Sequence, residues 1–374
     1  MRFVLFVHSL LSDWNHGNAH FLRGIATELQ ERGHEVRAFE PAQGWSRRNL
    51  LEMHGAEAWT GIRAAFPGLC SDEYDLGTLD LAAALDGADV VIVHEWNEPD
   101  LIRRLGRVRA AGGGFKLLFH DTHHRSVTQP AEMARYDLSA FDGVLAFGEA
   151  VRQRYLEQGW ARQVWTWHEA ADTRLFKPLP AVEKTGDLVW IGNWGDDERT
   201  AELHEFLLGP VGQLRLRADV HGVRYPEEGR LALAAAGIRY RGWLPNHQAP
   251  EVFARHRLTV HVPRRPYVRA LPGIPTIRVF EALACGIPLV SAPWDDAEGL
   301  FRVGRDLRMV RDGAGMRAAL KDLLNDPAAA AEQARVGLET VRSRHTCAHR
   351  VDELLGICAA LGVPGSFLSL AEVS

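Results

Sequence analysis

Short apolar runs typical of buried strands alternate with amphipathic segments typical of helices along almost the whole chain. In the first half, strands are expected at Arg2–Val7, Glu35–Phe39, Val90–His94, Lys116–His120 and Gly143–Ala146. Helices are expected between them at Asn18–Arg32, Pro99–Ala111 and Glu149–Gln158. This strand–helix order predicts a parallel sheet with helices on both faces, because parallel neighbours need a long crossover connection.

A proline-containing segment at residues 178–186 separates this pattern from a second one. Beyond it, strands are expected at Leu188–Ile191, Arg217–His221, Ile238–Tyr240, Leu258–Val262, Pro288–Ser291 and Leu307–Val310. A chain of 374 residues is long for a single core. We therefore expect an α/β protein with two doubly wound, Rossmann-like domains that face an inter-domain cleft.

The domain boundaries follow from the two patterns. We expect an amino-terminal domain at residues 1–170 and a carboxyl-terminal domain at residues 171–344. Residues 345–374 are expected to form a closing helix that packs back on the first domain. Residues 45–76 interrupt the first pattern, which indicates an irregular or helical insertion near the strand ends.

Composition narrows the function classes. The formal net charge of −5 argues against non-specific nucleic-acid binding, so no nucleic-acid partner is expected. The four cysteines show no metal-ligand spacing and no pairing pattern. No run reaches the roughly 20 apolar residues of a transmembrane helix. The apolar start of the chain resembles a first strand more than a signal peptide, and a cytoplasmic protein is expected.

The loop after the first predicted strand is long and polar. Gly17 precedes a helix and would let backbone approach a ligand, while Asp13, His16 and His20 could supply a general base. An ordinary capping and solvated loop is the alternative. The dinucleotide fingerprint Gly-x-Gly-x-x-Gly is absent after either first strand, which argues against an NAD-dependent enzyme.

Two further polar clusters follow strands of the first half. One is His94–Pro99 and the other is His120–Arg125, which contains Asp121. Both are predicted at carboxyl ends of parallel strands, where this architecture binds ligands. Hydrogen bonding to a sugar or diphosphate and ordinary loop polarity are two interpretations of these clusters, and a zinc site is a further interpretation of the second one. We expect no metal, because a defined ligand set is missing.

In the second half, Trp190–Arg199 predicts a strand, a glycine turn and the start of a helix. Gly192 and Gly195 could let amides face a phosphate, and Arg199 could neutralise it. Asn193 is a further candidate binding residue of this turn. The alternative is a tight turn in which Asp196 caps the helix.

The segment from Gly273 to Val290 predicts a loop, a helix and a buried strand. Thr276 is a candidate N-cap, and Glu281 lies inside the helix. A carboxylate there can accept hydrogen bonds from a ribose diol, while the positive helix end lies beside a phosphate. The alternative is a solvated helical Glu. Gly273, Ile274 and Arg278 complete the candidate nucleotide-binding residues.

Four pieces of the chain resemble a known enzyme family. They are Arg278-x-Phe280-Glu281-Ala282-x-Ala284-Cys285-Gly286-x-Pro288, Asp172-Thr173-Arg174-Leu175-Phe176-Lys177-Pro178, His120-Asp121, and Thr346 with His349 and Arg350. The first is similar to the F-E-A-x-A-x-G-x-P pattern of GT-B glycosyltransferases of group 1 (GT4-like), most closely the CgeB-like branch. One departure is Gly273, which stands where the family pattern has a second Glu, eight residues before Glu281.

The resemblance implies a hexosyltransferase that moves a sugar from a nucleotide-diphosphate donor to an unidentified acceptor, which could be a glycan, a protein or a small molecule. It implies donor binding by the carboxyl domain, acceptor binding by the amino domain, a metal-independent and retaining reaction, and no prosthetic group. His120, Asp121 and Asp13 are the candidate catalytic residues, and a homodimer is allowed. A non-catalytic nucleotide-sugar-binding protein of surface or spore assembly and a GT-B sugar-nucleotide epimerase are the alternatives.

Overall fold

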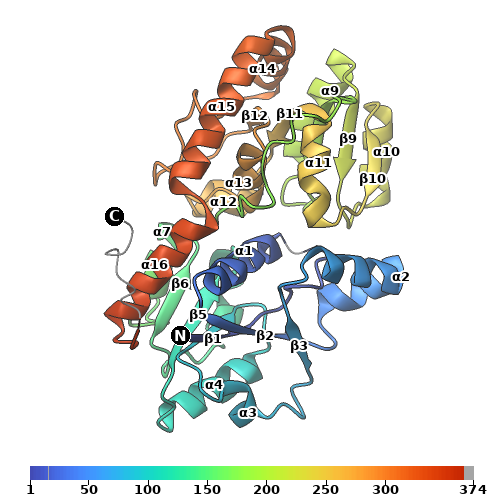
Figure 1. Cartoon of the computed structure of the whole chain (residues 1–374). Helices are drawn as coiled ribbons and strands as arrows, with labels where there is room; N and C mark the ends of the chain where they lie inside the picture. The colour runs from blue at the N-terminus through green and yellow to red at the C-terminus, as the bar shows by residue number, and fades with distance from the viewer. Residues whose placement is uncertain (16, 366–374) are drawn as a thin grey trace, which may run out of the picture. The chain divides into compact units, whose positions relative to one another are not determined.

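The chain divides into two compact units in a computed structural model that describes residues 1–15 and 17–365. The amino unit comprises Met1–Glu169 together with the segment from Cys347 onward, and the carboxyl unit comprises Ala170–Thr346. Each unit is a sheet flanked by helices (Figure 1).

The amino unit contains a seven-stranded sheet in the order β3-β2-β1-β4-β5-β6-β7. The strands are β1 (Arg2–Phe6), β2 (Glu35–Pro41), β3 (Ser71–Tyr74), β4 (Val90–His94), β5 (Lys116–Asp121), β6 (Gly143–Ala146) and β7 (Val164–Thr166). Every pair is parallel. All five residues of β4 are buried, as expected for a strand covered by helices on both faces.

The helices of the amino unit include the three that the sequence predicts. They are α1 (Asn18–Glu31), α2 (Trp45–Ala65), α3 (Leu81–Leu85), α4 (Pro99–Ala110), α5 (Arg125–Thr128), α6 (Pro130–Met133), α7 (Glu149–Glu157) and α16 (Cys347–Ala360). The insertion at residues 45–76 is helical only in part, because it also supplies the edge strand β3. The sequence of β3, Ser-Asp-Glu-Tyr, has no apolar alternation, and β7 was missed as well.

Helix α16 follows the carboxyl unit in sequence but packs on α1 of the amino unit. Arg32 at the end of α1 pairs with Asp352, and the indole nitrogen of Trp167 donates to the Arg350 carbonyl at 2.8 Å. Arg350 in turn donates to the His168 carbonyl at 3.0 Å. Residues 366–374 of the predicted closing helix lie outside the described residues.

The carboxyl unit contains a six-stranded sheet in the order β10-β9-β8-β11-β12-β13. The strands are β8 (Gly186–Ile191), β9 (Ala218–His221), β10 (Arg239–Gly242), β11 (His256–His261), β12 (Leu289–Ser291) and β13 (Arg308–Met309). The helices are α8 (Thr200–Leu203), η1 (His204–Leu208), α9 (Gly209–Leu214), α10 (Glu227–Ala235), η2 (Asn246–Gln248), α11 (Ala249–Ala254), α12 (Arg265–Ala270), α13 (Ile277–Ala284), α14 (Gly313–Asn325) and α15 (Pro327–Arg344). All six predicted strands are present, with ends shifted by one or two residues. The prediction of two doubly wound α/β sheets is therefore confirmed.

Both sheets reverse their strand order at one internal position. In the amino unit the chain runs outward from β1 to β3 and then resumes on the other side at β4. In the carboxyl unit the same reversal separates β8 from β11. Loops leave these paired strands in opposite directions and open a crevice at the carboxyl ends, where such sheets bind ligands.

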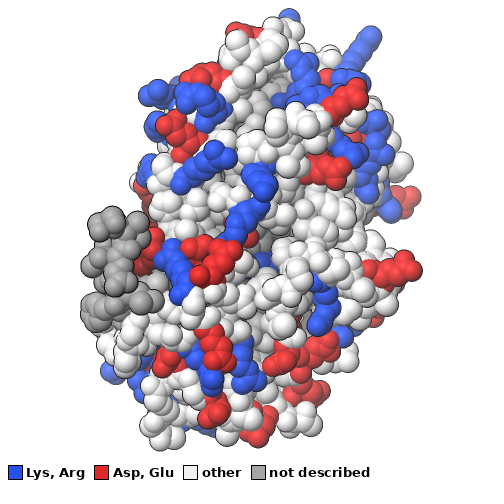
Figure 2. Space-filling model, viewed as in Figure 1, with Lys and Arg blue, Asp and Glu red and all other residues white. Residues whose placement is uncertain are grey.

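The surface carries both signs of charge. Acidic and basic side chains are interspersed over the face shown in Figure 2, and many arginines pair with a nearby carboxylate. Within residues 1–15 and 17–365, no helix is both long and apolar enough to cross a bilayer.

Candidate functional site

Arg199 ties together the two loops at the strand reversal of the carboxyl unit. One terminal nitrogen of its guanidinium donates to the carbonyl of Val262, directly after β11, at 2.9 Å. The other donates to the carbonyl and side-chain oxygens of Asn193, just after β8, at 2.7 and 3.0 Å. The guanidinium lies over the Trp190 ring at 4.9 Å. Arg199 therefore shapes the crevice between β8 and β11.

Most of the Arg199 donors are used inside the protein. The side chain is 9% exposed, and burial, with Arg264 nearby, lowers the pKa of Arg199 to about 9. At neutral pH it still carries a charge, and its two terminal nitrogens already donate to protein oxygens. Only its Nε lacks a partner among the described residues.

Arg264 is a site residue that sequence reasoning missed. It donates to the Asn193 side-chain oxygen at 2.9 Å and pairs with Glu198 at 2.9 Å. Arg199 and Arg264 thus meet at one amide oxygen, and the charge of Arg264 is compensated by Glu198. Its position three residues beyond the end of β11 could have identified it, by the same strand-end rule that selected the other candidates.

The loop after β8 adopts an unusual backbone. Gly195, Asp196 and Asp197 have φ values of 99°, 48° and 66°, three consecutive residues in the left-handed region. Helix α8 begins only at Thr200, so the alternative in which Asp196 caps the helix is wrong. A Cβ at Gly195 would lie 2.9 Å from Cγ of Arg199, so glycine leaves room for the arginine to fold back. Backbone of this kind concentrates at ligand sites.

Helix α13 brings its amino end to the same edge of the sheet. Thr276 occupies the N-cap position as predicted, but its hydroxyl makes no capping hydrogen bond. It lies 3.4 Å from Nε2 of His261, whose Nδ1 lies 2.9 Å from the Ser291 hydroxyl. Burial and the charge of Arg199 lower the pKa of His261 to about 3, so this row of side chains is neutral.

Glu281 is fully buried on α13, so the alternative of a solvated helical Glu is wrong. Its exposed fraction is 0%. Oε1 accepts from the Asn246 amide at 2.8 Å, and Oε2 pairs with Arg278 on the preceding turn. Both carboxylate oxygens are thus held by protein donors in a fixed orientation. Asn246 was missed because it lies outside the motif, at the start of η2.

Gly273 fills a special backbone position beside a carboxylate. Its φ is 85°, and its N–H donates to the Asp295 carbonyl at 2.7 Å. A Cβ there would lie 2.6 Å from Cγ of Glu298, in the loop after β12. Glu298 therefore occupies the space next to the position where the family pattern has its second Glu. Ile274 is 3% exposed and packs in the core.

In the amino unit, Glu95 and Arg125 form a buried ion pair at the ends of β4 and β5. Glu95 is 0% exposed, and its carboxylate pairs with Arg125 at 2.7 Å and accepts from the Thr122 amide at 2.9 Å. The Arg125 guanidinium lies over the Trp96 ring at 4.3 Å. The two predicted clusters are thus joined into one network.

Asp121 belongs to this network and is 0% exposed. It accepts from the Tyr155 hydroxyl at 2.8 Å and from the His123 amide at 3.1 Å. Burial, together with the negative charge of Glu95, raises the pKa of Asp121 well above its usual value. The raised pKa favours a protonated carboxyl that holds the strand ends together over a free general base.

His120 is completely buried among aromatic rings. Its ring centroid lies 4.9 Å from that of Trp167, 5.3 Å from that of His94 and 5.9 Å from that of Phe21. Neither ring nitrogen has a hydrogen-bond partner among the described residues. Burial lowers the pKa of His120 to about 3, so the imidazole is neutral. An unpaired buried polar group is costly and rare, which makes it a candidate for function.

The remaining candidates of the amino unit hold the fold. Asp13 pairs with Arg23 at 2.9 Å, and both side chains are buried, which is a structural arrangement rather than an open position for a base. Gly17 is the N-cap of α1 with helical φ and ψ, so no left-handed backbone requires it. His16 lies outside the described residues.

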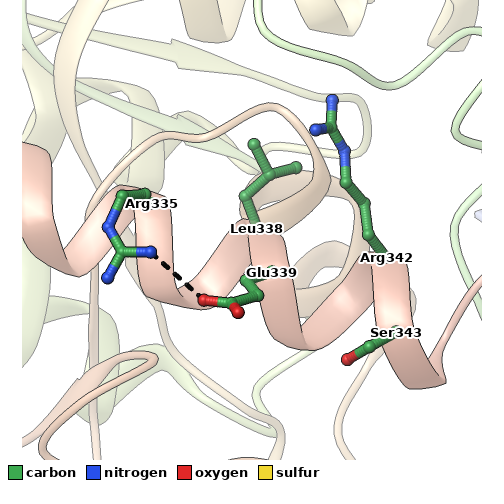
Figure 3. Close-up of a pocket in the computed structure, with 5 residues that line it drawn as sticks. All are labelled: Arg335, Leu338, Glu339, Arg342 and Ser343. Carbon is green, nitrogen blue, oxygen red and sulfur yellow. Dashed lines mark hydrogen bonds and ion pairs between the residues drawn. The ribbon is translucent and has the colours of Figure 1, made fainter.

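Two other features carry no such chemistry. A shallow hollow of about 400 Å³ lies on α15, lined by Arg335, Leu338, Glu339, Arg342 and Ser343 (Figure 3). All of these come from one surface helix, and the Arg335 guanidinium pairs with Glu339. In the part of the chain that the structure describes, no three His, Cys, Asp or Glu side chains gather as metal ligands would.

Comparisons with known proteins agree with this geometry. Residues 199–356 match the model of a family described as glycosyl transferase-like. Among solved structures, the chain is similar to a sucrose-phosphate synthase from Thermosynechococcus elongatus, with a TM-score of 0.66 and 14% identity over 96% of this chain and 99% of that one. No curated protein sequence matches the chain.

Two further structural neighbours were solved in complex with UDP. Anabaena HepE in complex with UDP and glucose gives a TM-score of 0.67 and 14% identity, over 96% of this chain and 100% of that one. An α-glucosyltransferase in complex with UDP and DNA gives a TM-score of 0.68 and 12% identity, over 96% of this chain and 100% of that one. The chain therefore has the GT-B fold, and the family match with these neighbours supports a GT-B glycosyltransferase.

We predict that replacing His120 with leucine changes how stability depends on pH. Between pH 6.5 and about 3, the unfolded chain binds a proton at His120 that the folded chain does not, so stability falls as pH falls. This group alone lowers the free energy of unfolding by about 1.4 kcal/mol per pH unit below pH 6.5. In urea unfolding, the free energy of unfolding of His120→Leu relative to that of the wild type should rise by about 2 kcal/mol from pH 7.0 to pH 5.0. An equal difference at both pH values would contradict the buried neutral ring.

Proposed function

We propose that the protein transfers a sugar, of the hexose type, from a nucleotide-diphosphate sugar to an acceptor. The carboxyl unit binds the donor. The observation that carries this proposal is the group of Arg199, Asn193 and Arg264 at the β8/β11 reversal. It is joined at the same sheet edge by the amino end of α13, the helix that carries Glu281.

The diphosphate is proposed to bind where N–H donors from three elements lie at one edge of the sheet. Arg264, the unpaired Nε of Arg199 and the first amides of α13 are donors at this edge of the sheet. Amides at a helix start and guanidinium groups both favour anions. They would also stabilise the charge that develops on a departing diphosphate, which is the main electrostatic demand of the reaction. We therefore propose that turnover is independent of a metal.

The ribose is proposed to bind Glu281. Asn246 and Arg278 hold its two oxygens in fixed positions, so the carboxylate can accept from a diol without reorganising. Glu298 is proposed to contact hydroxyls of the donor sugar, because it lies beside Gly273 next to the start of α13. This carboxylate would stand in for the second Glu of the family pattern.

His120, Asp121 and Asp13 of the amino unit are the candidate catalytic residues, with unequal roles, and His120 is proposed to contact the donor. The neutral imidazole of His120 can donate to a sugar hydroxyl or phosphate oxygen, because neither of its nitrogens is engaged among the described residues. Asp121 and Asp13 are proposed to position the strand-end loops through Tyr155 and Arg23. We further propose membership of group 1 (GT4-like), in its CgeB-like branch, with a retaining outcome.

UDP is the first nucleotide to test, since two structural neighbours are UDP complexes. Thermal melting with UDP, GDP, ADP and dTDP should reveal one that stabilises the protein, because a ligand bound only by the folded state raises the melting temperature. Calorimetry with that nucleotide should then show Glu281→Gln weakening the affinity by about 1.5–3 kcal/mol, the range for a hydrogen bond to a charged group.

The matched control for this variant is Asp306→Asn. Asp306 is also a carboxylate with 0% side-chain exposure that pairs with an arginine four residues away, Arg302, in the same unit. It lies outside the proposed nucleotide site, so its loss should affect stability and leave nucleotide affinity unchanged. Equal affinities for the wild type and folded Glu281→Gln would remove the ribose assignment.

We expect turnover to survive metal removal. Release of UDP from a UDP-sugar, by hydrolysis or by transfer to an added acceptor, should proceed in EDTA within twofold of the rate with Mn²⁺. The reason is that arginine and helix amides supply the charge stabilisation. Activity abolished by EDTA and restored by Mn²⁺ would contradict the proposal. Nucleotide binding without any turnover would instead favour a sugar-nucleotide-binding protein.

A further inference from the structure

Trp96 is an exposed aromatic side chain at a position where this architecture binds ligands. It is the second residue after β4, beside the reversal between β1 and β4, and 38% of its surface is exposed. Trp14, Trp167 and Trp294 are at most 7% exposed. A large ring that remains in solvent at a strand-end crevice calls for an explanation.

One face of the Trp96 ring is covered by the Arg125 guanidinium. Arg125 lies over it at 4.3 Å, and Arg125 is itself fixed by Glu95 at 2.7 Å and by the Tyr136 hydroxyl at 3.0 Å. The backbone N–H of Trp96 donates to Nδ1 of His94 at 3.4 Å. Because the ring is already ordered, a ligand that stacks on it loses little side-chain entropy on binding.

Three other rings cluster beside Trp96, and those of His123 and His8 are inclined to it by 73° and 47°. The centroid of His123 lies 4.9 Å from that of Trp96, and the centroid of His8 lies 6.4 Å from it. Trp45, at the start of α2, stacks on His8 at 6.4 Å. All three residues are half-buried. We call Trp96, His123, His8 and Trp45 the Trp96 platform.

The charge of the platform selects its ligand. The one guanidinium beneath it is compensated by Glu95, so it offers no uncompensated cation to an acidic ligand. Burial lowers the pKa of His8 to about 4, so that ring is neutral at pH 7. A pyranose has an apolar C–H face, which suits an exposed aromatic ring that no uncompensated charge accompanies.

We propose that the Trp96 platform binds a neutral pyranose ring of the acceptor. The inference rests on the proposed function, because the bound sugar is an acceptor only if the protein transfers a sugar. The binding itself is measurable without turnover. It assigns the acceptor to the carbohydrates, or to molecules that carry one, and makes Trp96 a residue that determines acceptor specificity.

Saturation-transfer NMR tests the proposal directly. The probes are the methyl glycosides of glucose, galactose, mannose and N-acetylglucosamine and their β-1,4-linked disaccharides, with phenol and glucuronate as an aromatic and an anionic comparison. The variants are Trp96→Ala, Trp96→Phe and Trp59→Ala. Trp59 is the matched control, because Arg47 lies over its ring at 4.7 Å on α2 while it has no place in the platform.

At least one neutral glycoside should give a signal with the wild type that exceeds those of phenol and glucuronate. That signal should fall at least fivefold in Trp96→Ala, persist in Trp96→Phe and remain unchanged in Trp59→Ala. Silence from all glycosides, a stronger signal from phenol or glucuronate, or an equal signal in folded Trp96→Ala would overturn the proposal.

Nucleotide-induced thermal stabilisation, measured on the same samples, keeps the two proposals apart. If a nucleotide stabilises the protein but no glycoside binds, the Trp96 platform proposal is contradicted and the proposed donor site is not. Glycoside binding that depends on Trp96, in a protein that no nucleotide stabilises, supports the platform and contradicts the proposed donor site.

Discussion

The candidate donor site depends on one buried arginine. Arg199 spans the strand reversal of the carboxyl unit and bonds to the backbone after β8 and after β11. In a doubly wound sheet these two loops diverge, and the gap between them is where a ligand enters. By tying their bases together, the guanidinium fixes the width of that gap and holds Asn193 towards Arg264. The loop residues Gly195–Asp197 have left-handed backbone, and the side chain of Arg199 packs against Gly195, where a Cβ would collide with it. Removing this tie would free both loops at once.

The sequence predicts the architecture well, because parallel sheets demand continuous apolar strands. β4, buried along its whole length, and β8, buried over most of its length, are recognisable from composition alone. The edge strand β3 is not, because an edge strand needs no apolar alternation and Ser71–Tyr74 pairs with β2 through backbone groups. The motif positions Thr276 and Glu281 were found by their helix spacing. Arg264, Asn246 and Glu298 were not, since each comes from a different loop and joins the site only through the fold.

Burial accounts for the differences between the expected and observed roles of the charged residues. Sequence reasoning treats a strand-end Asp, Glu or Arg as available to a ligand. In the structure, Asp13, Glu95 and Arg199 are each committed to protein partners, because a charge removed from water requires them. What remains for a ligand is different: neutral imidazoles, exposed arene surface and a few donors with spare capacity. His120 illustrates this, as its value lies in two nitrogens that the described residues leave unused.

Hydrogen–deuterium exchange in the presence of the stabilising nucleoside diphosphate tests the central claim most directly, because it reports on backbone amides without a mutation. The account predicts slower exchange in peptides that cover residues 192–199 and 274–281, at the β8 loop and the start of α13. Peptides from β13 and α14, which play no part in the proposed site, should be unchanged. Protection confined to other segments, with these two peptides unaffected at saturation, would contradict a donor site at the strand reversal of the carboxyl unit.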